Sequence, residues 1–349
     1  MRTLLSRCVK PLLLAGLFAS VLVMSPALVV RAQEAAPETG GQTGPRLDFP
    51  AGLATDSRSV WVASSRNNTV TAIDIASHSI SLVAGETFKE GSNDGTGSSA
   101  RFKSPDGLVL VGRNLYVADT NNSDIRKINI DTKVVSIAAG IANIPGTDDG
   151  PAGSAHFNLP TQLASDGNAI FITDSGNSTV RRLSLGDNNV KTIGGQAQQT
   201  GKDDGPASKS TYSGPRGIAT DGKFVYVADT GNDIIRKIDL STLETKTIAG
   251  TGEEGLNNGP GEKATFNNPG AMCLNGTSLY VMDADNHAIR KIDTSSNEVS
   301  TLALANGHIG SGCTVTADGH TLYYSDTTEN SVQATDTSNG NYAPLYPLQ

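Results

Sequence analysis

The hydrophobic and polar positions of this chain repeat with a period close to 55 residues. A proline opens each unit at steps of 55, 55, 55 and 54 residues, namely at Pro50, Pro105, Pro160, Pro215 and Pro269. A sixth and shorter unit follows, for which Gly312 is taken as the opening position after a step of 43 residues. Self-similarity at such a period is typical of repeat architectures, so the chain is predicted to be an array of six units.

Each unit contains four short runs rich in β-branched and aromatic residues. In the fourth unit they are GIAT (217–220), FVYVAD (224–229), IIRKID (234–239) and ETKTIAG (244–250). Turn-forming Asp-Gly and Gly-Asn pairs separate such runs. Six units of four short strands predict an all-β fold, a six-bladed β-propeller with four-stranded antiparallel blades. Because one small sheet cannot cover both of its apolar faces, each blade must pack on its neighbours in a closed ring.

The last unit is the weakest match, since it offers only YAPLY (342–346) as a fourth strand. We therefore expect that ring closure borrows residues near Leu47.

The repeat resembles a known motif. Its consensus is D-G-x(4–5)-[AS]-x-[FY]-x-x-P-x-G-[IL]-A-x-D-G-x-x-x-Y-V-A-D-T-G-N-x-x-I-R-K-I, which is similar to the NHL repeat. The third to fifth units match it closely, the second nearly as well, and the first and sixth loosely. The resemblance implies a six-bladed β-propeller. It implies little about activity, because that family includes interaction scaffolds, sensor domains, and a few lyases and hydrolases.

Two charged positions recur in register. A carboxylate directly follows the second strand of five units: Asp119, Asp174, Asp229, Asp283 and Asp326. Seven residues further, four units carry an arginine: Arg126, Arg181, Arg236 and Arg290. We expect the aspartate to accept N–H groups of the following turn, and the arginine to lie between blades, paired with a carboxylate. A device present in every blade is predicted to be structural; the alternatives are rings of carboxylates or arginines that bind a ligand.

The loops before the second to fifth units carry an aromatic residue three positions before the proline, which is predicted to pin the loop onto the blade edge. They also carry acidic residues, predicted to form a partner-binding surface on one face of the disc: Asp94, Asp148, Asp149, Asp203, Asp204, Glu253 and Glu254. Calcium binding by the paired acids is an alternative, although no loop supplies a full set of spaced oxygen ligands.

Composition narrows the class of function. The net charge is −8, but the first 32 residues hold four basic and no acidic side chains, so the remainder has 23 basic and 35 acidic groups, a net charge of −12. So acidic a surface argues against nucleic-acid binding. The five histidines occupy different repeat phases, which speaks against the zinc-dependent lyases that the resemblance invites. No catalytic residue, metal ligand or cofactor is therefore predicted, except that lactonase-like calcium propellers stay open as an alternative.

The N-terminus has the layout of a targeting segment. Arg2, Arg7 and Lys10 precede an apolar run over 12–24, and small residues at Ala27 or Ala32 offer cleavage sites. Residues 1–32 are therefore predicted to be a signal peptide of a secreted or lumenal protein; the alternative is an uncleaved anchor that tethers the protein to a membrane. Residues 33–46 are predicted to be a flexible linker, and residues 47–349 the propeller.

Two further groups depend on the compartment. Cys273 and Cys313 lie near the innermost strands of adjacent units and could form a disulfide, with buried free thiols as the alternative. Glycosylation sequons begin at Asn67, Asn121, Asn177 and Asn275, and the first three lie in the hairpin after the second strand, where we expect a sugar to be exposed.

The absence of a catalytic motif directs the prediction of function. We predict an exported, non-catalytic interaction propeller that binds a protein or a glycan through its loop face. The alternative is a metal-dependent hydrolase or lyase with its site in the central channel.

Overall fold

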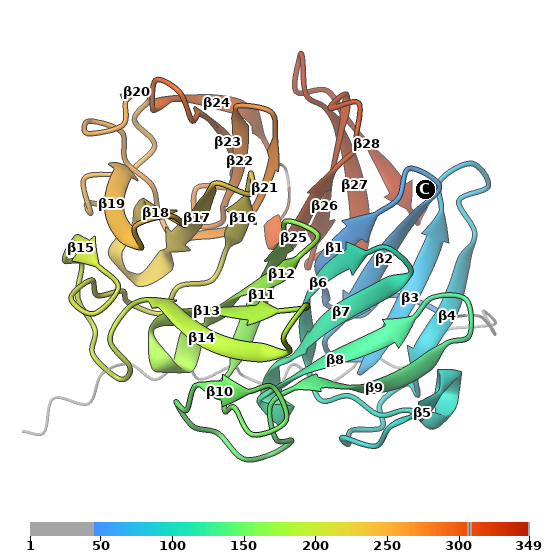
Figure 1. The fold of residues 1–349 in the computed structure, drawn as a ribbon. Coiled ribbons are helices and arrows are strands. Elements are labelled where there is room, and N and C mark those ends of the chain that lie inside the picture. Colours follow the sequence, from blue (N-terminus) through green and yellow to red (C-terminus); the bar gives the residue numbers. More distant parts are fainter. Residues whose placement is uncertain (1–44, 306, 308, 348–349) are drawn as a thin grey trace, which may run out of the picture. The chain divides into compact units, whose positions relative to one another are not determined.

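Six antiparallel sheets surround a central axis in the computed structural model, which describes residues 45–305, 307 and 309–347 (Figure 1). The described residues belong to one unit, Gly44–Gln349, and the predicted signal peptide and most of the predicted linker lie outside them. Each sheet is one blade, and its strands follow one another from the axis outwards. The prediction of a six-bladed β-propeller is confirmed.

The strands run from the axis to the rim in four sets. The innermost strands are β1 (Pro50–Thr55), β6 (Pro105–Val111), β11 (Pro160–Ser165), β16 (Ile218–Thr220), β21 (Pro269–Asn275) and β25 (Ile309–Val315). The second strands are β2 (Ser59–Ser64), β7 (Asn114–Asp119), β12 (Ala169–Asp174), β17 (Phe224–Asp229), β22 (Ser278–Asp283) and β26 (Thr321–Asp326).

The third strands are β3 (Thr69–Asp74), β8 (Asp124–Asn129), β13 (Thr179–Ser184), β18 (Ile234–Asp239), β23 (Ala288–Asp293) and β27 (Ser331–Asp336). The fourth strands are β4 (Ile80–Gly85), β9 (Val134–Ala139), β14 (Asn189–Gly194), β19 (Glu244–Ala249), β24 (Glu298–Leu304) and β28 (Tyr342–Tyr346).

Four blades have a fifth, two-residue strand that the sequence does not predict. These strands are β5 (Gly95–Thr96), β10 (Gly150–Pro151), β15 (Gly205–Pro206) and β20 (Gly259–Pro260), and each pairs with the fourth strand of its blade at the rim. Each is the Asp-Gly or Asn-Gly end of a long loop, which therefore wraps the outer edge of the blade that follows it. Four short 3₁₀ turns complete the fold: η1 (Gly97–Ser99), η2 (Thr120–Asn122), η3 (Ser175–Asn177) and η4 (Thr230–Asn232).

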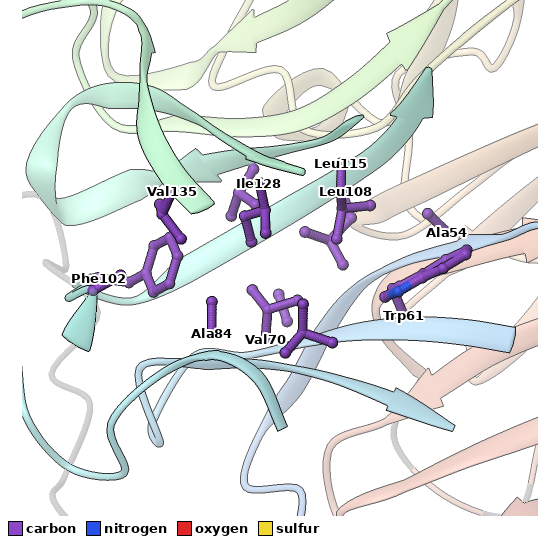
Figure 2. Packing of buried hydrophobic residues seen from close by; sticks show 13 residues of the cluster. Ala54, Trp61, Val70, Ala84, Phe102, Leu108, Leu115, Ile128 and Val135 are labelled. Carbon is purple, nitrogen blue, oxygen red and sulfur yellow. The ribbon is translucent and has the colours of Figure 1, made fainter. Parts of the chain in front are cut away.

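The core consists of six apolar clusters, one between each pair of adjacent blades. Between the first two blades, Trp61 and Val70 of the first face Leu115 and Ile128 of the second, and the loop aromatic Phe102 closes the outer end (Figure 2). Because every second side chain of a strand points to the same face, each central strand contributes to the clusters on both sides. The ring closes through the same kind of packing between the last blade and the first, where Leu47 and Leu53 meet Tyr323 and Leu345.

Leu47 takes part in ring closure, as expected, but through packing and not as a strand of the last sheet. No strand near Leu47 joins the last sheet in the described part of the chain; β28 is that sheet's own fourth strand, and β1 packs against β25. The start of the sixth unit was misplaced. Ile309 pairs with Asp326, as Pro269 pairs with Asp283. Gly312, three residues after Ile309, takes the place that Gly52, Gly107 and Gly217 take two residues after their opening positions.

Hydrogen bonds between blades explain another repeated residue. The hydroxyl after the second strand donates to the carbonyl of the next blade's proline, in the pairs Ser65–Pro105, Thr120–Pro160, Ser175–Pro215 and Thr230–Pro269. The Ser or Thr that follows Asp119, Asp174 and Asp229 therefore ties adjacent blades together near the axis.

Candidate functional site

The repeated arginines form buried clusters with two partners each. In the fourth blade, Arg236 on β18 is buried; Nη1 donates to Asp229 Oδ2 at 2.9 Å and Nη2 to Asp204 Oδ1 at 2.8 Å. The guanidinium lies 4.9 Å from the ring centroid of Tyr212 and also binds the carbonyl of Thr211. Strand, loop and aromatic residue are thus fixed to one another by a single side chain.

The cluster recurs in three other blades. Arg126 binds Asp119 and Asp94, Arg181 binds Asp174 and Asp149, and Arg290 binds Asp283 and the side-chain oxygen of Asn258, all at 2.7–3.2 Å. Phe102, Phe157 and Phe266 lie under the first, second and third of these guanidinium groups. Burial raises the pKa of each inner aspartate, to about 6 for Asp119, against the opposing effect of its arginine and hydrogen bonds. In all four blades the arginine and its inner aspartate therefore pair with one another.

The first and last blades lack this cluster. Ser64 and Thr71 occupy the two positions in the first blade, and Gln333 replaces the arginine in the last. Asp326 is buried there and accepts the backbone N–H groups of Thr328 and Glu329.

The predicted acidic surface divides into two groups. Asp94, Asp149 and Asp204 hold the buried arginines, so these carboxylates stabilise the loops. Their side chains remain 43–55% exposed, so their predicted place in a partner-binding surface stays a prediction. The side chain of Asp148 is 72% exposed and lies 3.1 Å from His156 Nδ1. Asp203, Glu253 and Glu254 are also exposed.

Two of the predicted glycosylation sites are buried, so the expectation that a sugar would be exposed there is wrong. Asn67 and Asn177 are buried at about 1% exposure, and each donates its amide to a main-chain carbonyl, that of Arg46 and Gly146 respectively. A sugar on either amide would remove the hydrogen bond and would not fit in the folded blade. Asn121 is exposed, and Asn275 is half-buried at the end of its strand.

The two cysteines are free thiols in this structure, and both are buried in the cluster between the last two blades. Burial and the neighbouring thiol of Cys273 raise the pKa of Cys313 well above its usual value. The alternative of buried free thiols therefore describes them.

The central channel opens into a cavity of about 340 Å³ at the face from which the long loops enter the blades. We call this cavity the mouth. Asp106, Thr161, Arg216 and Gly270, which directly follow the opening residues of their units, line it, and Ser311, two residues after Ile309, takes the same place in the sixth unit. Asp285, on the turn after β22, also lines it. These positions are equivalent in the repeat but differ in chemistry, so the mouth is the part of the channel at which the six-fold pattern is broken.

A polar network crosses the mouth. Asp106 Oδ1 accepts from Gln162 Nε2 and from Ser311 Oγ, both at 3.0 Å, and Gln162 Nε2 also donates to the carbonyl of Ser311. Gln162 comes from the third blade and Ser311 from the sixth, which are opposite each other in the ring. Burial raises the pKa of Asp106 to about 6, although the charge of Arg216 and both hydrogen bonds oppose that shift.

Close approach of the blades explains why Gln162 is exceptional. Equivalent positions are glycine in four other blades, where neighbouring backbones nearly touch; a Cβ at Gly217 would lie 1.9 Å from the carbonyl oxygen of Gly270. The third blade has a long side chain instead, and this side chain enters the mouth. Farther along the strands, a second cavity of about 210 Å³ is lined by residues such as Leu108, Leu163 and Met272.

Sequence reasoning missed the mouth because it searched for residues that repeat. Asp106, Gln162 and Arg216 differ from their counterparts in the other units. The available signal was the Pro-x-Gly segment itself: its middle position varies from unit to unit, while the ring brings all six copies to one axis.

Possible metal ligands do not cluster within residues 45–305, 307 and 309–347. No three histidine, cysteine, aspartate or glutamate side chains gather there closely enough to hold a metal ion. The residues that line the mouth do not fit a zinc or calcium centre built from several such side chains. In the same residues no helix is long and apolar enough to span a membrane.

Relatives of known description carry the same repeat. The chain is 30% identical over 302 residues to NHL repeat-containing protein 2 of Bos taurus and 30% identical over 306 residues to that of Homo sapiens; the matches cover 60% and 61% of this chain. The chain is similar to these NHL repeat-containing proteins, and its described residues fold as a β-propeller. The propeller spans 42% of the length of these two relatives. No family model matches the chain.

Solved structures share the fold of the propeller at low sequence identity. The nidogen–laminin complex aligns with a TM-score of 0.58 at 15% identity, covering 81% of this chain and 92% of that one. A gluconolactonase of Xanthomonas campestris aligns at 0.56 and 13% identity, covering 80% and 84%. A streptogramin B lyase aligns at 0.52 and 11% identity, covering 81% and 92%. At such identities the similarity is one of fold alone.

Proposed function

We propose that this propeller is an exported, non-catalytic binding protein whose protein partner docks on the loop face over the mouth of the channel. The observation that carries the proposal is the asymmetric mouth, a cavity of about 340 Å³ where equivalent repeat positions present a carboxylate, a guanidinium and hydroxyls, and where Gln162 adds an amide. A concave site with a few convergent polar groups is the usual setting for specific recognition.

The fate of the repeated charges supports this assignment. The buried arginines pair with the aspartates of their own blades, so these four pairs do not form a ring of unpaired charges that could bind a ligand. The remaining exposed acids, Asp148, Asp203, Glu253 and Glu254, lie on the loops that enter the same face. They would surround the docked partner and accelerate the encounter with a basic surface.

The alternative function is that of a hydrolase or lyase with its site in the channel. Asp106 favours it, because a carboxyl group with a pKa raised to about 6 in a cavity could act as a general acid or base. Elemental analysis after dialysis separates the metal-dependent form of this alternative from a binding protein. A metal retained at one ion per chain would favour the enzyme.

Site-specific photo-crosslinking tests the proposed docking surface. A photoreactive residue at Thr327, which lines the mouth, should crosslink to a defined protein in the native compartment. The same residue at Asp187, an exposed position in the turn between β13 and β14 at the other end of the blade, should give no such product. Crosslinking from Asp187 alone would contradict docking at the loop face.

Export is part of the proposal and has its own test. We expect the mature protein to begin after Ala27 or Ala32, which N-terminal sequencing of the native protein would detect. A native chain that keeps its first residues and partitions with membranes would instead support the uncleaved anchor.

A further inference from the structure

Asp106 has no basic side chain in contact with its carboxylate among the described residues. Its side chain is half-buried in the mouth, and Oδ1 accepts the two hydrogen bonds from Gln162 and Ser311. Arg216 and Asp285 are the other charged residues that line the cavity, and the arginine acts on Asp106 through its charge without an ion pair within 4.0 Å in the described part of the chain.

The aspartates of the four arginine clusters differ from Asp106 in having a contacting cation. Asp119, Asp174, Asp229 and Asp283 are fully buried within the blades, and each has the guanidinium of its own blade at 2.8–3.2 Å. Removing a carboxylate from water is costly unless a cation and hydrogen bonds compensate for the lost hydration. Asp106 has the hydrogen bonds and lacks the contacting cation.

We propose that the mouth binds the ammonium or guanidinium group of a basic side chain from the partner, with Asp106 as its anchor. This inference rests on the proposed function and adds the chemistry of recognition to it. Gln162 and Ser311 hold one carboxylate oxygen, and this leaves Oδ2 to receive the incoming N–H groups. Asp285, which also lines the mouth, supplies a second negative charge.

The walls of the cavity fit the remainder of such a side chain. Phe49, Ala271 and Ile309 line one part of it and provide apolar surface for a methylene stem, which long basic side chains bury while their charged ends are paired. The chain uses the same combination internally, where Arg126 lies over the ring of Phe102 and binds Asp119.

The charge of Arg216 allows a test of whether the mouth prefers a cationic or an anionic ligand. Its positive charge faces the cavity, so it opposes a cationic ligand and would favour an anionic one. Replacing Arg216 by glutamine should therefore strengthen the binding of a cation, while replacing Asp106 by asparagine should weaken it. Asparagine keeps the shape of the side chain and an oxygen for Gln162 and Ser311, so the network can persist in the variant.

The experiment is a titration of the full-length protein with blocked Gly-X-Gly peptides, in which X is lysine, arginine, norleucine or glutamate. We expect the lysine and arginine peptides to bind at the mouth, as followed by calorimetry or NMR, and the norleucine peptide to bind at least about tenfold more weakly. Asp106→Asn should lower the affinity of the basic peptides by about tenfold, and Arg216→Gln should raise it a few-fold.

Matched controls remove the same charges elsewhere. Asp187→Asn and Lys191→Gln alter exposed residues of the third blade, far from the mouth, and should leave the affinity unchanged. Binding of the basic peptides should also weaken as the pH falls through about 6, where Asp106 takes up a proton; Arg216 and Asp285 are the charged groups that face it.

Each outcome decides the inference. If the glutamate peptide binds and Arg216→Gln abolishes that binding, the mouth recognises anions and the inference is wrong, while a binding function stands. If no peptide binds but a partner still crosslinks to position 327, the partner docks without a basic anchor, and the inference is also overturned. If neither occurs, the proposed function fails together with it.

Discussion

A buried guanidinium is stable only where most of its polar atoms find partners inside the protein. Arg236 meets this condition through Asp229, Asp204 and two loop carbonyls, and its Nε alone lacks a partner among the described residues. Removal of one member of such a pair leaves the other charge buried without compensation.

Arg236→Met should therefore lower the free energy of unfolding by about 3–5 kcal/mol, because Asp229 would remain buried without its cation. Urea denaturation measures the change, and Lys246→Met, the same replacement at an exposed position of β19, should cost less than about 0.5 kcal/mol. Adding Asp229→Asn to the first variant should restore part of the loss. Equal costs at positions 236 and 246 would show that the cluster contributes nothing.

Asp124 predicts a dependence of stability on pH. It is fully buried at the start of β8, and neither carboxylate oxygen has a partner among the described residues. Burial raises its pKa to about 8, with the nearby charge of Asp119 acting in the same direction and that of Arg126 against it. Since an unfolded aspartate has a pKa near 4, the folded state holds the proton more tightly, and stability falls as the pH rises from about 4 to about 8.

Asp124→Asn should therefore stabilise the protein increasingly over this range, by up to about 1.4 kcal/mol for each pH unit relative to the wild type. Denaturation curves of both proteins at pH 5, 6, 7 and 8 measure the difference, with Asp187→Asn as the exposed control. A constant difference between wild type and variant across these pH values would refute the account of Asp124.

Residue patterns predicted part of this chemistry. The spacing of arginine and apolar residues on one strand face correctly indicates a buried arginine paired with a carboxylate. It does not reveal that Asp94, Asp149 and Asp204 complete the clusters, because each lies 32 residues before its arginine and meets it only after the loop has wrapped the blade. The same wrapping, with its extra rim strands, depends on loop geometry that the turn residues alone do not specify.

The blade is the element at which differences between units have consequences. The second to fifth blades have an arginine cluster, a loop aromatic and a rim strand, whereas the sixth has none of these in its described residues. The sixth blade should therefore open more readily than its neighbour.

Hydrogen exchange tests this difference directly. Amide groups of β26 and β27 in the sixth blade should exchange at least about tenfold faster than those of β22 and β23 in the fifth, because they open without breaking an arginine cluster. Peptides covering 321–336 and 278–293 allow the comparison by mass spectrometry. Slower exchange in the sixth blade would mean that packing at ring closure, and not the cluster, controls local opening.

In the whole ring each blade has two apolar faces, and the sixth covers one face of the fifth blade and one of the first. A chain that ends at Ala305 should therefore lose cooperative unfolding and associate through the uncovered clusters. Circular dichroism and size-exclusion chromatography measure both effects. A chain that begins at Pro45 keeps all six clusters and should remain folded and monomeric; equal behaviour of the two truncations would contradict the closed ring.

The ring also explains why function was harder to predict than fold. Repetition marks residues that every blade needs, and those residues hold the blades together. The mouth is built from what differs between units, and only the closed ring brings Asp106, Gln162 and Ser311 from three blades to one axis. Six aligned repeats predict the axis, but not which variable side chain reaches across it.

The central claim is that the repeated clusters maintain the fold while the variable residues at the mouth bind the partner. Retention of the partner by Gln162→Gly tests it most directly, because glycine is the residue at this position in other blades and the change removes only the side chain that crosses the mouth. The account predicts a free energy of unfolding within about 1 kcal/mol of the wild type and at least about tenfold weaker retention of the partner. Undiminished retention by the folded variant would contradict it.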